Sequence, residues 1–568
     1  MIRPNEDFAP LFSKDEYTQD DLLNIGPFFT NLDKPVYVPL IFSPELMGAL
    51  CSRTSRAAKD LRHVFLHEFI YPFINPVRTE KDTDNSWTEK VQYGQKLAEF
   101  ISFLNTHSIL DLFSNPKARS FYSTWLAQYG DDSIAQMAGT HLVFCGISQV
   151  AIKHPEDQRI GLAPIEKSTR YVNYSRKVSG QYLYYIDPTL EDLGLRDQYC
   201  KAMDNLFDTY AGFQPRLIKW LSDKFPSEKP AVIEKKAFDT LRGLLPMATL
   251  SQVAFFGNGQ AFEHLINRSL AHNLGEIRWV GHQALKELNQ VTPSFLRRIQ
   301  DETKKELVEK NQRYLAEKNI RVNPFVHELM DHTICSSDKP TVSIVESDPD
   351  GEEKVITGIL YSARDNHRTW NQIYNAVIQM DDLDKKKVLD AYLEGREARW
   401  QKVGRAFENT YTRFEIVMNA GAWRDLHRHR MLTQQRQLFS CHHGYDIPPE
   451  IIESGLENEF RSTIGQAEDI FNKLEKIDPE LAQYASTMAH RVRFIQWENL
   501  RQSFWQIELR TIPEGHPDYR YIEQEKFRLL QNIYPLISSY IMVNMGQYNF
   551  ARRGQEEKIQ KKIDNINQ

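Results

Sequence analysis

The chain has 568 residues, of which 41% are hydrophobic and 26% charged, and a formal net charge of −6. This balance is typical of a soluble globular protein, excludes a disordered or fibrous one, and the length predicts more than one domain. Because the net charge is slightly acidic, nucleic-acid binding is not expected, and an anion must be bound by a local group of cations. Five scattered cysteines, none in a CxxC pair, indicate neither a disulfide framework nor a zinc ribbon.

No segment of the sequence is typical of export or of a membrane span. The beginning of the chain lacks the apolar core of a secretory signal. The most apolar segment, near residues 135–152, is interrupted by Gln136, Thr140 and His141. We therefore expect a cytoplasmic protein with no membrane contact.

Taken in chain order, the patterns predict more helix than strand. Alternation at 179–186 predicts a strand, as it does again at 341–347. Apolar residues at three- and four-residue spacing predict long helices over 199–225, 294–319 and 526–545. The fold class is therefore predicted to be α+β.

The two halves of the sequence resemble each other. "GALCSRTSR" from Gly48 is similar to "GILYSARDN" from Gly358, and "GNGQAFEHLINR" from Gly257 is similar to "ENLRQSFWQIELR" from Glu498. The shared order indicates a tandem duplication. We place the boundary near residue 320, after a highly charged helical segment, and expect domains 1–320 and 321–568.

Two further segments have more than one interpretation. The acidic, turn-forming segment 347–355 is expected to be a hairpin-type loop. The basic triplet 428–430 is typical of a solvated helix face, an anion site or a metal site. Four histidines and Cys441 lie between His427 and His443, but no pair has the spacing of a zinc site. We expect no metal.

The stretch "RHRMLTQQ" resembles the signature of flavin-dependent thymidylate synthases, RHRxxSx(N/Q)ExSxR. The matching residues are Arg428, His429, Arg430 and Gln435, with Thr433 in place of the serine. The rest of this signature is replaced by Arg436, Leu438 and Ser440. The first half shows the complementary loss: it keeps only Arg159 of the triplet, but after one extra residue it reproduces the ending with Glu166, Ser168 and Arg170.

Other family segments are present in degenerate form. "SRTS", with Ser55, is similar to the flavin-phosphate serine segment, and "LRGLLP" matches the ARxxLP element with Arg242. The NxR…R segment resembles both copies. Its counterparts are Asn258, Gln260 and Arg268 in the first half, and Asn499, Arg501 and Arg510 in the second. The histidines on the flavin side are replaced by Met137 and Asn409.

The resemblance implies two tandem flavin-dependent-thymidylate-synthase-like domains, each a small mixed or antiparallel sheet with several long helices. It implies reductive methylation of dUMP to dTMP with FAD as cofactor and NADPH and methylene-tetrahydrofolate as co-substrates. Guanidinium groups suit this reaction because they bind phosphate and pyrimidine oxygens. A homodimer would then form a four-lobed assembly with a site shared between the lobes.

The resemblance also assigns a role to each residue. The catalytic pair is Arg510 and Arg268. The flavin-binding residues are Arg428, His429, Arg430, Gln435, Asn499, Arg501 and Ser55. The nucleotide-binding residues are Glu166, Ser168, Arg170 and Arg242.

Two alternatives stay open. The first alternative is a nucleotide- or flavin-binding protein that has lost its catalytic activity and has a structural or regulatory role, because both flavin-side histidines are missing. The second alternative is a flavoenzyme that acts on another pyrimidine, because Arg436 and Ser440 depart from the signature.

Overall fold

The computed structural model describes residues 3–80, 82–112, 115–121, 132–330 and 339–551. They pack into two compact units, each built around its own four-stranded sheet. Unit 1 comprises Met1–Gly212, Leu245–Thr333 and Ser462–Ala485. Unit 2 comprises Phe213–Leu244, Ile334–Arg461 and Ser486–Gln568.

The sheet of unit 1 is antiparallel, with the strand order β1-β2-β6-β3. Its strands are β1 (Val36–Tyr37), β2 (Gly139–Ser148), β6 (Leu250–Asn258) and β3 (Leu162–Glu166). Three helices pack on this sheet: α9 (Gln149–Glu156), α13 (Gly259–Leu270) and α14 (Gly275–Val291). Val143, Cys145 and Ala254 of the sheet share a hydrophobic core with the N-terminal helices.

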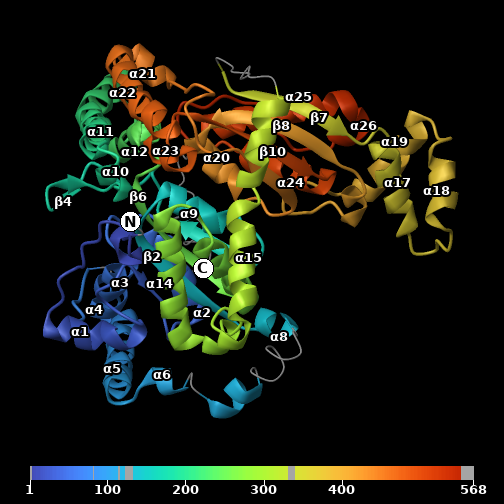
Figure 1. The fold of residues 1–568 in the computed structure, drawn as a ribbon. Helices are drawn as coiled ribbons and strands as arrows, with labels where there is room; N and C mark the ends of the chain where they lie inside the picture. Colours follow the sequence, from blue (N-terminus) through green and yellow to red (C-terminus); the bar gives the residue numbers. More distant parts are fainter. Residues whose placement is uncertain (1–2, 81, 113–114, 122–131, 331–338, 552–568) are drawn as a thin grey trace. The chain divides into compact units, whose positions relative to one another are not determined.

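The sheet of unit 2 is also antiparallel, with the order β7-β8-β10-β9. Strands β7, β8 and β10 are labelled in Figure 1. Its strands are β7 (Thr341–Ser347), β8 (Thr412–Asn419), β10 (Arg491–Glu498) and β9 (Leu432–Arg436). The counterparts of the three helices are α20 (Ala420–His427), α24 (Leu500–Arg510) and α25 (Pro517–Ile533).

The two sheets follow the same chain path. In each, the second strand leads into a short helix, a loop and the edge strand, and the last strand leads into a helix capped by an asparagine, Asn258 or Asn499. The edge strands have the same register, because Leu162 pairs with Gly257 and Leu432 pairs with Glu498. This repetition confirms the predicted α+β class with two tandem copies of a small antiparallel sheet.

The remaining helices complete the two units. The N-terminal part contains α1 (Gln19–Ile25), α2 (Pro44–Thr54), α3 (Leu61–Val64), α4 (Tyr71–Ile74), α5 (Asp84–Thr106), α6 (Ile109–Leu112) and α8 (Asp132–Met137). The middle contains α10 (Thr189–Asp192), α11 (Arg196–Lys224), α12 (Pro230–Leu241), α15 (Lys305–Glu317) and α16 (Asn323–Leu329). The C-terminal part contains α17 (Gly351–Tyr361), α18 (Trp370–Val377), α19 (Asp382–Leu393), α21 (Pro449–Glu453), α22 (Glu457–Glu475), α23 (Pro479–Ala482) and α26 (Pro535–Ser538).

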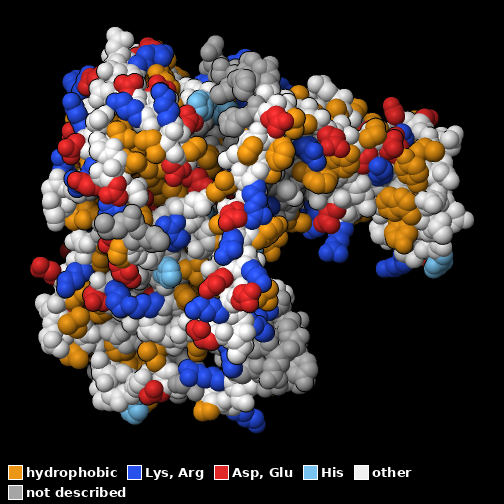
Figure 2. Space-filling view, viewed as in Figure 1, with side chains coloured by type: hydrophobic (Ala, Val, Ile, Leu, Met, Phe, Trp, Pro, Cys, Tyr) orange, Lys and Arg blue, Asp and Glu red, His pale blue; other side chains and the backbone are white. Residues whose placement is uncertain are grey.

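Helix α11 and strand β7 confirm the elements predicted at 199–225 and 341–347. Of the segment 294–319, the α-helical part is α15, along which both signs of charge are visible (Figure 2). The helix predicted over 526–545 is wrong at its end, because Pro535 cannot continue α25.

Two other predicted elements are corrected. The expected loop at 347–355 is shorter, because α17 already begins at Gly351. In the expected strand 179–186, only Gln181–Tyr182 form a strand, β5, which pairs with β4 (Lys177–Val178).

The compact units do not coincide with the sequence halves. Phe213–Leu244 of the first half belongs to unit 2, and Ser462–Ala485 of the second half belongs to unit 1. These segments are counterparts, because each contains a helix followed by a short 3-10 turn, η4 (Arg242–Leu244) or η9 (Gln483–Ala485). The division into 1–320 and 321–568 stays a prediction about where the sequence repeat divides. In the folded structure, one segment of each half packs in the unit formed mainly by the other half.

Candidate functional site

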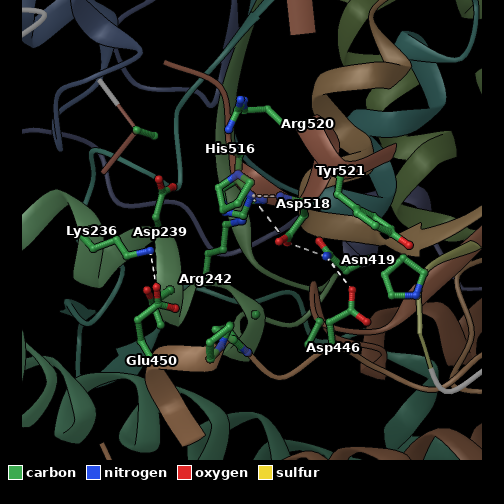
Figure 3. A pocket seen from close by; sticks show the side chains of 18 of the residues that line it. Lys236, Asp239, Arg242, Asn419, Asp446, Glu450, His516, Asp518, Arg520 and Tyr521 are labelled. Carbon is green, nitrogen blue, oxygen red and sulfur yellow. Dashed lines mark hydrogen bonds and ion pairs between the residues drawn. The ribbon is translucent and has the colours of Figure 1, made fainter. Parts of the chain in front are cut away.

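Unit 2 contains a cavity of about 490 Å³ where several of its elements begin or end (Figure 3). Arg242 and Gly243 follow the end of α12, Asn419 caps the start of α20, and His516 caps the start of α25. Strand and helix ends leave polar backbone and side-chain groups available, so this is a favourable place for a polar ligand.

An asparagine between two carboxylates forms one wall of the cavity. Asn419 Nδ2 donates to Asp446 Oδ2 at 2.9 Å and to Asp518 Oδ2 at 2.7 Å (Figure 3). Arg491 Nε donates to Asp446 Oδ1 at 2.6 Å. Burial raises the pKa of Asp518, an effect that Arg242 opposes and Asp446 reinforces. Asp518 is therefore easier to protonate than an ordinary aspartate.

Arg242 is the predicted phosphate ligand that reaches this cavity. Its side chain is buried, lines the cavity and lies close enough to Asp518 to lower the pKa of that carboxyl. Gly421, at the start of α20, leaves room for the Arg242 guanidinium, since a Cβ there would lie 3.2 Å from Arg242 Nε. The cavity wall thus offers a ligand two groups, the Arg242 cation and the Asp518 carboxyl with its raised pKa.

Unit 1 has a closed version of the same arrangement. Ser148 caps α9 as Asn419 caps α20, and the Glu276 carboxylate occupies the place of Asp518. Glu276 accepts from the Ser148 hydroxyl at 2.6 Å and from the Tyr484 hydroxyl at 2.8 Å. Tyr484 is fully buried. The Tyr484 phenol therefore donates from within the protein a hydrogen bond that the Glu276 carboxyl would otherwise accept from a ligand or from water.

The basic triplet lies at the C-terminal end of α20, ahead of β9. Arg428 forms an ion pair with Asp425 at 2.9 Å, whereas the Arg430 side chain is exposed. His429 is buried, and its Nε2 accepts a hydrogen bond of 2.8 Å from Arg510 Nε. Burial, then the Arg510 charge, keeps the pKa of His429 well below its ordinary value. His429 is therefore a neutral acceptor.

The β9–β10 register brings the triplet beside the start of α24. Leu432 pairs with Glu498, so the loop that precedes Leu432 lies next to Asn499. The Asn499 side chain caps α24 through Gln502 N at 2.9 Å, and Arg501 is paired with Glu408. Gln435 is exposed on β9. The register thus brings the triplet next to Asn499, whereas Gln435 lies further along β9, opposite Ile495.

These residues fit an anionic cofactor. The first turn of a helix presents backbone N–H groups that favour phosphate. Arg428 and Arg501 each form a partly exposed ion pair, with 35% and 29% of their side chains accessible. Such pairs contribute little stability, so their guanidinium groups can turn to a phosphate. Arg430 is already exposed.

The remaining predicted residues belong to unit 1. Ser168 N donates to Ser55 O at 2.8 Å, and Arg170 N donates to Ser168 Oγ at 3.2 Å, so these three residues lie together. Glu166 is buried and accepts from Lys153 Nζ at 2.9 Å. In unit 1 the ExSxR ending is therefore part of a largely buried strand end.

Arg268 and Arg510 do not occupy equivalent helix positions. Arg510 is 510 − 499 = 11 residues after its capping Asn499, whereas Arg268 is 268 − 258 = 10 residues after Asn258. One residue turns a helix by about 100°, so the two arginines point in different directions. Gln260 Oε1 accepts from Gln136 Nε2 at 2.9 Å.

The two positions that replace flavin histidines carry other side chains. Met137 is 89% exposed, and Asn409 Nδ2 donates to Ala406 O at 2.9 Å. Neither residue can supply an imidazole.

Comparison with known proteins decides the family. Residues 80–294 and 344–536 match the Thy1 family, described as "Thymidylate synthase complementing protein". The chain belongs to this family. The Thy1 match in two segments agrees with the two copies of the sheet.

Relatives of this Thy1 protein include full-length and half-length ones. A UPF0159 protein of Chlamydia pneumoniae is 33% identical over 96% of this chain and 99% of its own length. A UPF0159 protein of Thermoplasma acidophilum is 27% identical over 78% of this chain and 92% of its own length. The flavin-dependent thymidylate synthase of Corynebacterium glutamicum is 27% identical over 39% of this chain and 85% of its own length. That relative therefore matches less than half of the tandem chain.

The structure adds residues that the sequence did not single out: Asn419, Asp446, His516 and Asp518. Only Asn419 has a sequence signal, since an Asn directly before a predicted helix is a common cap. Motif spacing alone does not bring them to Arg242.

Two further observations concern metal ions and membranes, and both are made on the described residues. Within the described ranges, no group of three or more His, Cys, Asp or Glu side chains is placed to hold a metal ion. Of the basic cluster, His443 Nε2 contacts Gln437 Oε1 at 3.1 Å and His427 stacks on Trp423. No described helix is both long and apolar enough for a membrane span.

Proposed function

We propose that this Thy1 protein is a flavin-dependent thymidylate synthase that methylates dUMP to dTMP with FAD, NADPH and methylene-tetrahydrofolate. The observation that carries the proposal is that Arg242, the expected phosphate ligand, lines a 490 Å³ cavity of unit 2. The volume is within the usual range for a small-molecule site. A cytoplasmic location and a homodimer with sites shared between lobes belong to the same proposal.

Each residue of the cavity has a role in this proposal. Arg242 binds the nucleotide phosphate, because a guanidinium offers several donors and stays charged. Asp518, when protonated, donates to a carbonyl oxygen of the pyrimidine, and Asn419 holds its carboxyl in place. The walls of the cavity exclude water from these hydrogen bonds, which strengthens them.

The loop 428–430 and the start of α24 hold the flavin in this proposal. Arg428, Arg430 and Arg501 bind its phosphates, with Gln435 and Asn499 beside them. His429 positions Arg510 through the hydrogen bond between Nε2 and Nε, and Arg510 polarises the pyrimidine. Reduced flavin, when bound, supplies the hydride. In unit 1, Ser55 is proposed to contact flavin phosphate, and Glu166, Ser168, Arg170 and Arg268 to contact nucleotide.

A second candidate is a nucleotide- or flavin-binding protein without thymidylate synthase activity. The exposed Met137 and the Asn409 side chain at the flavin-histidine positions favour it. The two carboxylates beside Asn419 favour a variant of this idea, in which the flavoenzyme acts on a pyrimidine with an amino group.

The two candidates differ in a turnover assay. We expect purified protein with FAD, NADPH and methylene-tetrahydrofolate to convert dUMP to dTMP, and Arg242→Ala to lose this activity. Arg216→Ala is the matched control, because Arg216 belongs to unit 2 but forms an exposed pair with Glu459. Binding of dUMP without turnover supports the second candidate. Loss of turnover in Arg430→Ala and Arg170→Ala separately would support the shared site.

A further inference from the structure

A row of three side chains, two of them polar, crosses the sheet of unit 1. Cys145 of β2 is the register partner of Gln252 on β6, and Lys167 N, just beyond β3, donates to Gln252 O at 2.8 Å. Directly opposite residues in antiparallel strands place their side chains on the same face. All three line a cavity of about 200 Å³ that is separate from the one in unit 2.

The backbone at this row is irregular. The register of β2 shifts between Cys145 and Ile147, and Gly146 has a φ of 76°. Such a bulge re-aims the neighbouring side chain and often lies beside a functional site. The row is therefore placed by a specific irregularity of the strand.

Lys167 brings a buried hydrogen-bond donor to this cavity. Its Nζ donates to Ala58 O at 3.1 Å and to Lys59 O at 3.0 Å. An ammonium has three donors, so one remains for a ligand. Burial lowers the pKa of Lys167 to about 8, so most of it is still an ammonium at neutral pH.

Gln252 brings a buried acceptor. Its side chain is 6% exposed, and among the described residues its Oε1 has no hydrogen-bond partner. A buried acceptor without a partner destabilises a folded protein, and such groups in native structures commonly have a functional cause. Oε1 of Gln252 is therefore the second independent sign of a ligand.

The other copy shows that the fold does not require this row. At the equivalent positions unit 2 has Val417, Arg493 and Gln437, since Val417 pairs with Arg493 and Gln437 N donates to Arg493 O. Arg493 pairs with Glu415 at 2.6 Å, and Gln437 contacts His443. The polar groups of that row are satisfied within unit 2.

We propose that the cavity of unit 1 binds a small cyclic amide, with its C=O at Lys167 and its adjacent N–H at Gln252. One edge of such a ligand has a C=O acceptor beside an N–H donor. These two groups complement the Lys167 ammonium, which donates, and Gln252 Oε1, which accepts. A cavity of about 200 Å³ is below the usual range for nucleotide-sized ligands, so it suits a single ring. A carboxylate would satisfy Lys167 but would leave Gln252 Oε1 without a donor.

The probe pair 2-pyridone and N-methyl-2-pyridone tests the proposal on the full-length protein. The two rings have nearly the same shape, but only the first has the N–H. Ligand-observed NMR should show binding of 2-pyridone and an affinity for the methylated ring that is lower by about tenfold or more, as loss of one hydrogen bond implies. Equal affinity for the two rings, or binding of acetate but not of 2-pyridone, would overturn it.

Two variants assign the binding to this cavity. Gln252→Leu should lose 2-pyridone binding and raise the midpoint of thermal unfolding, because it removes an unsatisfied buried oxygen. Gln437→Leu changes the equivalent row of unit 2 and should leave binding unchanged. Arg242→Ala should also leave it unchanged, so the proposal stands or fails separately from the nucleotide site. A folded Gln252→Leu protein that still binds 2-pyridone would overturn the proposal.

Discussion

Gly243 and Tyr484 occupy the same backbone position in the two copies of the fold. Ala489 N donates to Gly243 O at 3.0 Å in unit 2, and Ala248 N donates to Tyr484 O at 3.1 Å in unit 1. The glycine lines an open cavity, whereas the tyrosine is buried and donates to Glu276. One residue thus accounts for much of the difference between an open and a closed site.

The first prediction concerns this position. Gly243→Tyr should block the cavity and abolish dUMP binding, measured by isothermal titration calorimetry, because the new side chain takes the place of the ligand. A Cβ at Gly243 would lie 3.2 Å from Ala489 Cβ, so the local fit should also be tighter. Gly212→Tyr, at a helical glycine with open space around it, is the control and should bind normally. Unchanged affinity in Gly243→Tyr would show that dUMP binds elsewhere.

The second prediction concerns pH. Burial raises the pKa of Glu276 from 4.5 to about 7, so between these values the folded state holds the proton and the unfolded state does not. Stability therefore falls as pH rises from 4.5 to 7, by about 3 kcal/mol in order of magnitude. Glu276→Gln removes this dependence. Its unfolding midpoint should exceed that of wild type more at pH 8 than at pH 5, and a constant difference would contradict the shift.

The third prediction concerns His429 and Arg510. Arg510→Met removes a donor and a positive charge from the imidazole, so the pKa of His429 should rise. NMR of histidine labelled at Cε1 measures the titration. Arg216→Met, a change in an exposed ion pair, should leave the pKa unchanged. A His429 signal that titrates identically in Arg510→Met would mean that the arginine does not hold the imidazole neutral.

Much of this site was predictable from the sequence. The resemblance assigned the segment 428–430 and Asn499 to one ligand, and the pairing of Leu432 with Glu498 brings these two segments side by side. The first copy also has one residue more than the second between the capping residue, Ser148 or Asn419, and the first residue of the edge strand, Leu162 or Leu432, in agreement with the extra residue noted in the signature. Local spacing is sufficient for such features.

The cavity was not predictable in the same way. Arg242 lies in the segment that packs in unit 2, and its neighbours Asp446 and Asp518 are more than 200 residues away in sequence. Nothing in their local spacing brings them together, because the exchange of segments depends on tertiary packing. The carboxyl of Asp518 also gains its raised pKa mainly from burial, with a contribution from Asp446, and both depend on the tertiary structure.

The fourth prediction concerns the support of the sheet in unit 2. Lys526 is fully buried, lies 2.9 Å from Glu498 Oε1 and donates to Gln496 Oε1 at 3.1 Å. Lys526→Met leaves a carboxylate buried without its cation and should destabilise the protein by about 3 to 5 kcal/mol. Thermal unfolding followed by circular dichroism measures the loss.

The control for this change is Lys219→Met. Lys219 pairs with Asp223 on the surface of α11, where an ion pair contributes little. Its unfolding midpoint should equal that of wild type. Equal midpoints for Lys526→Met and Lys219→Met would mean that the buried ion pair does not stabilise unit 2.

The absorbance spectrum of the full-length protein with FAD, recorded before and after addition of dUMP, tests the central claim most directly. Flavin bound beside the nucleotide changes its visible absorbance when dUMP enters the site. We predict a bound-flavin spectrum that dUMP perturbs in wild type and in Arg216→Ala but not in Arg242→Ala. A colourless protein that retains no FAD, or a flavin spectrum that dUMP leaves unchanged, would contradict the proposed function.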